Sequence, residues 1–110
     1  MIPNTIAEIE ARVRQSGALP EPSKAELLNL LSTLKSEVGE LAKTRGAQAA
    51  SIAEHAKVVT DATIGEARNP AARQPSLDRL TGSVSEFEGT HPKLVEVVNR
   101  LATMLSNSGI

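Results

Sequence analysis

The Glu-x-x-His motif of Glu88 and His91 is the residue pair in this chain whose spacing comes closest to that of a metal site. On a helix, this spacing places a carboxylate and an imidazole on one face, as in di-iron bundles, which need two such motifs and two further carboxylates. One hypothesis is therefore a metal-binding helical bundle that uses Glu88 and His91 of symmetry-related chains. However, His91 precedes Pro92, and a proline disfavours helical geometry in the residue before it. The competing interpretation is that His91 shapes a helix junction, with its ring packed near Phe87 and one ring nitrogen bonded to the backbone.

The sequence contains few of the residue types that other kinds of catalysis require. The sequence has no cysteine and no tyrosine, which excludes thiolate nucleophiles, disulfides and zinc–sulfur sites. Its glycines are scattered singly and match neither of the glycine-rich patterns that bind nucleotides. Glu86 and Glu88 lie two residues apart, so on a helix they do not face each other as an acid–base pair. We therefore predict a protein that is not an enzyme and that has no metal and no cofactor.

Composition and charge narrow the class of protein further. A chain of 110 residues fits a single helical domain, residues 1–110, and 40% hydrophobic residues exclude a disordered chain. The net charge is −1 and no segment concentrates basic residues, which argues against nucleic-acid binding. No stretch approaches the ~20 apolar residues that span a bilayer, and the first residues lack the features of a signal peptide. We expect a cytoplasmic protein with no nucleic-acid and no membrane partner.

Apolar residues that recur at helical spacing predict an all-α fold. The pattern indicates a short N-terminal helix and three further helices, at about 4–16, 24–68, 76–90 and 92–107. The helix at 24–68 contains no proline, although Gly46 lies inside it. A kink, or two helices in place of one, would fall at 44–47. We predict one continuous helix, which forms a long antiparallel hairpin with the helices that follow it.

The hairpin helices carry apolar residues at alternating spacings of three and four, which is typical of a coiled-coil seam. We call these positions the predicted self-association seam. It comprises Leu27, Leu31, Leu34, Val38, Leu41, Ile52, Val59, Leu77, Leu80, Val84, Phe87, Leu94, Val98, Leu101 and Leu105. His55 falls on the more polar part of this register. There it either sets the oligomeric state, with protonation near about pH 6 loosening the interface, or is a partly exposed histidine with little role.

The scarcity of aromatic side chains favours an oligomer. Phe87 is the only Phe, Tyr or Trp in the chain, whereas a globular monomer of this size usually buries several rings. A hairpin of two helices would also leave Leu28, Leu30, Val97 and Met104 exposed, and exposed apolar surface of that extent marks an association site. We therefore predict a homodimer or higher oligomer that packs as a coiled-coil-like bundle.

Two segments near the C-terminus carry a resemblance. Residues 87–94 read Phe-Glu-Gly-Thr-His-Pro-Lys-Leu, and residues 105–110 read Leu-Ser-Asn-Ser-Gly-Ile. Both are similar to segments of a family of small bacterial proteins known as domain of unknown function 4404. The chain departs from that family by a longer stretch between about residues 44 and 75. The resemblance implies a small helical bacterial protein and brings no activity with it.

These observations favour a non-catalytic, self-associating helical protein that serves as an interaction module or scaffold. Its biochemical role is not specified by the residues, and an additional partner protein of unknown identity would bind to an apolar stripe or an end surface. The alternative is the metal-binding bundle described above.

Overall fold

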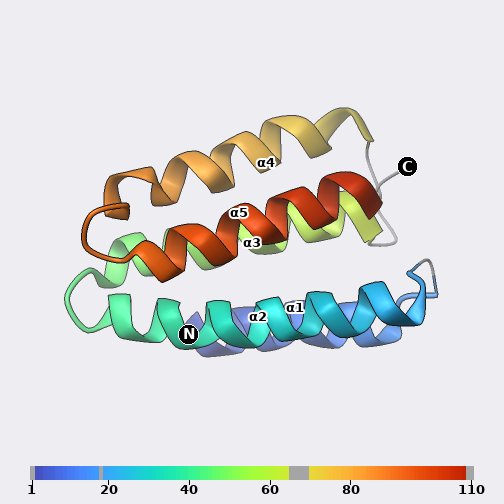
Figure 1. Cartoon of the computed structure of the whole chain (residues 1–110), viewed down its shortest axis with the longest axis horizontal. Helices are drawn as coiled ribbons and strands as arrows, with labels where there is room; N and C mark the ends of the chain where they lie inside the picture. The colour runs from blue at the N-terminus through green and yellow to red at the C-terminus, as the bar shows by residue number, and fades with distance from the viewer. Residues whose placement is uncertain (1, 18, 65–69, 109–110) are drawn as a thin grey trace.

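The computed structural model describes residues 2–17, 19–64 and 70–108, and the described part of the chain is helical with no strand (Figure 1). The prediction of an all-α fold is therefore confirmed. The helices are α1 (Ile2–Gln15), α2 (Glu21–Ala42), α3 (Gly46–Ile64), α4 (Pro70–Val84) and α5 (Pro92–Ser108), with a short 3-10 helix, η1 (Ser85–Phe87), between α4 and α5.

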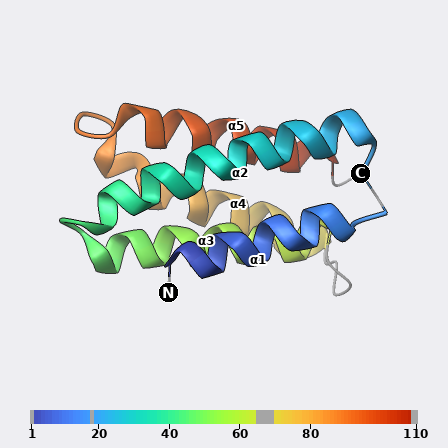
Figure 2. The ribbon, with the colours of Figure 1, turned by 90° about the horizontal axis from the view of Figure 1, so that it is seen from below.

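The five α-helices lie side by side along a body of 37 × 23 × 22 Å, and each runs opposite to the one before it (Figure 1). α3 occupies the middle of the bundle and contacts α1, α2, α4 and α5. α2 passes between α5 on one side and the layer of α1 and α3 on the other (Figure 2). α1 and α5 thus pack against different sides of α2.

The continuous helix predicted at 24–68 is wrong, because the chain reverses between Ala42 and Gly46. The amides of Thr44 and Arg45 both donate to the carbonyl of Leu41, at 3.1 and 2.8 Å, and close a tight turn there. A straight helix would have kept the apolar stripes of its two halves far apart. Reversal packs α3 back against α2, so both stripes become part of one core within a single chain.

The start of α4 also differs from the prediction of a helix at 76–90. α4 begins at Pro70 and continues through Pro75, which is exposed, before it ends at Val84. Pro75 cannot donate a backbone hydrogen bond, so it weakens the helix at this point. The effect is limited because Pro75 lies near the start of α4, in its second turn, and faces solvent. Ser76, expected just at the start of this helix, is instead buried inside it at 4% exposure.

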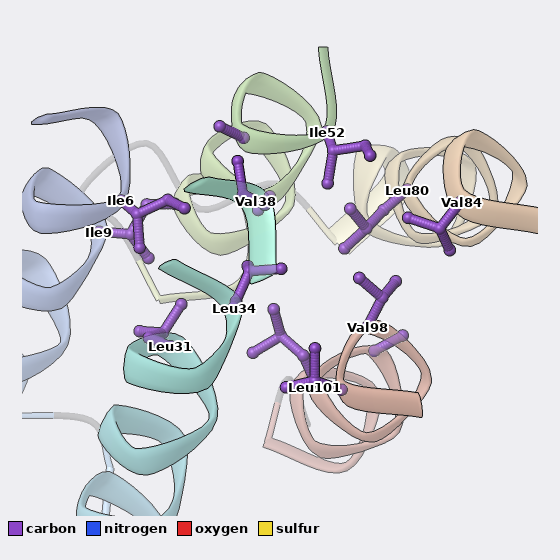
Figure 3. Packing of buried hydrophobic residues seen from close by; sticks show 14 of the residues in the cluster. Ile6, Ile9, Leu31, Leu34, Val38, Ile52, Leu80, Val84, Val98 and Leu101 are labelled. Atoms are coloured by element: carbon purple, nitrogen blue, oxygen red, sulfur yellow. The ribbon is translucent and has the colours of Figure 1, made fainter. Parts of the chain in front are cut away.

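All fifteen residues of the predicted self-association seam lie in the hydrophobic core of a single chain. Side chains from α1, α2, α3, α4 and α5 point toward one another in this core (Figure 3). Because the core has one ring, Phe87, its volume is filled by aliphatic side chains. The small residues Ala49, Ala53 and Ala56 on α3 are fully or almost fully buried, which lets the neighbouring helices approach α3 closely.

The expectation that a single chain leaves its apolar stripes exposed is therefore wrong. Val97 is 4% exposed, while Leu28, Leu30 and Met104 are partly buried against the core. Among the described residues, Val58 is the exposed large hydrophobic side chain, at 46%. The reason is the extra reversal after α2, which supplies a further helix to cover what a two-helix hairpin would expose.

Candidate binding groove between α2 and α5

Glu88 and His91 lie in the connection between η1 and α5, so they do not share the face of one helix, whereas the metal hypothesis requires a shared face. His91 is the residue just before the first residue of α5, Pro92, which is where a proline disfavours helical backbone. Over the ranges 2–17, 19–64 and 70–108, no three His, Asp or Glu side chains gather as metal ligands. The described residues of one chain therefore give the metal hypothesis no ligand cluster.

His91 packs at the helix junction. Its ring stands edge-on to that of Phe87, with the centroids 5.9 Å apart and the planes at 89°. The backbone amide of His91 donates to the carbonyl of Phe87 at 2.7 Å. Its Nδ1 lies 3.0 Å from the hydroxyl oxygen of Thr90, so the described partner of the ring nitrogen is a side chain and not the predicted backbone group. The predicted packing of His91 near Phe87 is confirmed.

A hollow of about 290 Å³ lies beside His91 at one end of the bundle. The turn between α2 and α3 meets the connection from η1 to α5 there, and the lining residues are Thr44, Arg45, Glu86, Phe87, Thr90 and His91. Because it combines one guanidinium with one carboxylate, the charge of this hollow favours neither anions nor cations. The other singled-out histidine, His55, lies half-buried on α3.

A larger hollow, of about 680 Å³, runs along α5 beside the start of α2, and we call it the α2–α5 groove. Its lining residues are Glu26, Glu88, Pro92, Val95, Glu96, Asn99, Arg100, Thr103, Met104 and Asn107. Eight of the ten belong to α5, at positions that repeat every three or four residues, so the groove follows one flank of that helix. Glu26 belongs to α2, and Glu88 to the connection before α5.

The floor of the α2–α5 groove is apolar and its rim is polar. Val95 is 8% exposed and Met104 is half-buried against the core, whereas Asn99 and Thr103 are exposed. Val95 and Met104 are nine residues apart, which corresponds to about 13 Å along a helix. An apolar floor with a few polar groups above it is the usual composition of a site that binds another molecule.

The rim of the groove carries an excess of negative charge. Among its lining residues are three glutamates and one arginine. The Nη2 atom of Arg100 lies 3.6 Å from Oε1 of Glu96, one turn away on the same helix. Glu26 and Glu88 have no ion pair with any other described residue. Two carboxylates of this groove therefore have no ion-pair partner in the part of the chain that the structure describes.

Sequence reasoning singled out only part of this groove. The sequence predicts Met104 as part of an exposed apolar association surface and offers Glu88 as a metal ligand, but it does not place the two in one groove. Glu26 is separated from Glu88 by more than sixty positions in the sequence. Only the antiparallel packing of α2 on α5 brings the two into one lining. The available signal was the set of apolar residues that lie outside the seam, because these mark where a helix has a second apolar side.

None of the described helices combines the length and the hydropathy that crossing a membrane would require. A model of the family described as Domain of unknown function (DUF4404) matches residues 27–110, which is well over half of the chain. The match begins within α2 and contains the whole α2–α5 groove except Glu26, while α1 precedes it. No curated protein and no solved structure matches the chain.

Proposed function

Since the chain belongs to the family of domain of unknown function 4404, whose description assigns no activity, we propose a function from its geometry: a non-catalytic helical binding protein that holds a partner protein in the α2–α5 groove. The observation that carries this proposal is the groove of about 680 Å³ with Val95 and Met104 in its floor. Such a surface can exclude water from an apolar side chain of a partner while its polar rim orients the contact.

The non-catalytic part of the proposal is supported by the sequence. It has no cysteine and no tyrosine, and its glycines follow no phosphate-binding pattern. A cytoplasmic location is part of the same proposal. Its only support is the sequence, which has neither a long apolar stretch nor the features of a signal peptide in its first residues. A protein is a better candidate partner than a nucleic acid, because the carboxylates of Glu26, Glu88 and Glu96 would repel phosphate groups.

Self-association stays a prediction, but the surface that would join two copies is no longer the predicted seam. The residues predicted to join two copies are buried within one copy, so the seam no longer supplies the reason for a dimer. A second copy would have to use surface that one chain leaves open, such as the groove or the side of α3 that exposes Val58. Analytical ultracentrifugation of the purified chain over a range of concentrations tests this prediction. A species of about twice the chain mass would support it.

A photo-crosslinking experiment tests the proposed function. A photoreactive amino acid replaces Asn99, which is exposed in the groove, and the protein is irradiated in its native cells. The matched control carries the same amino acid at Ser51, which is exposed on α3 and is not part of the groove lining. We expect a crosslinked protein at position 99 that is missing at position 51.

The partner identified in this way is then purified and tested for direct binding. Thr103→Trp places a large side chain on the rim of the groove, so we expect it to weaken binding at least tenfold. Ser51→Trp serves as the control and should leave binding unchanged. The proposed function fails if both crosslinking positions capture the same proteins, or if Thr103→Trp binds the purified partner as tightly as the unsubstituted chain.

A further inference from the structure

We propose that the occupant of the α2–α5 groove is an amphipathic helix of the partner protein that carries a basic side chain near each of its ends. This inference rests on the proposed function, because it names the kind of partner segment that the same groove would hold. It follows from three properties of the described residues: the charge of the rim, the length of the groove, and the way in which α2 already holds a helix on its other side.

The negative charge of the rim favours a partner segment that carries basic side chains. Of the three lining glutamates, Glu96 is the one that forms an ion pair within the described part of the chain, with Arg100 at 3.6 Å. Glu26 and Glu88 are exposed carboxylates that form no ion pair with another described residue. A lysine or arginine of a partner that comes to rest beside each of them gains a charge-assisted contact, whereas an acidic partner would be repelled.

The positions of these two carboxylates set the spacing of the cations. Glu88 precedes the first residue of α5, and Glu26 lies in the first turns of α2, which runs antiparallel to α5 (Figure 1). The two therefore lie toward opposite ends of the groove. From Pro92 to Asn107, the groove follows α5 for about 22 Å, which is the length of a helix of roughly 15 residues. An apolar stripe of such a helix can cover both Val95 and Met104.

α1 shows how α2 accepts a helix on its other side. The apolar stripe of α1, formed by Ile6, Ile9 and Val13, is fully buried. At the flank of that stripe, the carboxylate of Glu10 receives a hydrogen bond from Nζ of Lys35 on α2 at 2.9 Å. In the α2–α5 groove the bundle provides the carboxylates, as Asp61 does for Arg12 of α1, so the incoming helix would provide the cations.

Binding of synthetic helical peptides to the full chain tests this inference. The basic probe is an amphipathic peptide of about four helical turns, made of leucine and alanine, with lysine flanking the leucine stripe near both ends. The acidic probe has glutamate in place of every lysine, and the neutral probe has glutamine. Fluorescence anisotropy of labelled peptides measures affinity, and NMR chemical-shift mapping shows where on the protein each probe binds.

The variants are Glu26→Gln, Glu88→Gln and the double variant, and Glu54→Gln is the matched control because Glu54 is an exposed carboxylate of α3 outside the groove. We expect the basic probe to bind in the groove more tightly than the other two. Each groove variant should weaken its binding by about 2- to 5-fold, as expected for exposed ion pairs. Glu54→Gln should leave it unchanged, and added salt should reduce the difference between probes.

Two results would overturn the inference: binding of the acidic or neutral probe at least as tight as that of the basic probe, or an affinity of the basic probe that Glu54→Gln lowers as much as Glu26→Gln. Absence of basic-probe binding in the groove would overturn it as well. If the neutral probe maps to the groove in these cases, the proposed function survives without the basic helix. If position 99 also fails to crosslink a partner that position 51 does not, the proposed function fails with it.

Discussion

The two sides of α2 offer a direct comparison, because one holds α1 and the other, together with α5, borders an open groove. On the first side, three aliphatic residues of α1 are fully buried, and ion pairs join the helix to its neighbours. On the second side, the floor is only partly covered, and two carboxylates have no cation among the described residues. Both sides have an apolar strip with charged flanks, but only the first is filled.

The ion pairs make the contrast sharper. Within the described part of the chain, the salt bridges between different helices all involve α1: Glu10 with Lys35, Glu8 with Lys57, and Arg12 with Asp61. The remaining salt bridges join residues three or four apart on α2, on α5, or at the end of α2. The Oδ1 atom of Asp61 is buried and lies 2.8 Å from Nη1 of Arg12, so that guanidinium offsets its charge. Charge thus aligns α1 on the bundle, whereas α5 is held mainly by apolar contacts.

The largest expected effect comes from shortening a buried residue on the filled side. Ile9 is fully buried between α1 and its neighbours, so Ile9→Ala should lower the free energy of unfolding by about 2–4 kcal/mol. Met104→Ala removes a half-buried side chain from the floor of the open groove and should cost only about 1 kcal/mol. Urea unfolding followed by circular dichroism measures both. Equal losses would show that the groove floor is packed as tightly as the contact between α1 and its neighbours. The contrast between the two sides of α2 would then be wrong.

A smaller effect is expected from the charge that flanks the α1 contact. The side chain of Glu10 is 8% exposed and pairs with Lys35, so Glu10→Gln should lower the free energy of unfolding by about 1–2 kcal/mol. The control is Glu40→Gln, since Glu40 pairs with Lys43 where both side chains are more than half exposed. That variant should change stability by no more than about 0.5 kcal/mol. Unfolding curves at low and high salt measure the two losses, and an equal loss in both variants would contradict the assigned role of Glu10.

The interior of this bundle could be predicted from the sequence to a large extent. Alternating spacings of three and four identified Leu31, Val38, Leu80 and Leu101 as positions that face other helices, and all four are fully buried. The periodicity could not say whether those helices belong to one chain or to two. An a/d stripe needs only another apolar stripe, and the physical chemistry of burial is the same for either source.

The features that escaped prediction depend on how distant segments meet. The reversal at residues 43–45 uses no proline and no residue with positive φ, so it leaves little mark on the sequence. Once the chain reverses there, α3 covers α2, and the exposed stripes expected of a hairpin disappear. The α2–α5 groove was missed for the same reason, because Glu26 and Met104 become neighbours of one hollow only through the packing of two helices far apart in the sequence.

The smallest predicted effect concerns Gly39, on the side of α2 that faces α1. Gly39 follows Lys35 by four residues, so the two lie on the same side of the helix, and Lys35 pairs with Glu10 of α1. A Cβ atom placed at Gly39 would meet no atom within 4 Å. Gly39→Ala should therefore raise the free energy of unfolding by about 0.5–1 kcal/mol, since alanine favours the helix over glycine.

The matched control for this change is Gly82→Ala in α4, where a Cβ atom also meets no neighbour within 4 Å and no contact with α1 is involved. We expect both variants to gain stability by similar amounts in urea unfolding. A gain at Gly82 together with a loss at Gly39 would mean that α1 lies closer to α2 than the structure shows. The packing of α1 would then not be a guide to how a partner helix lies in the groove.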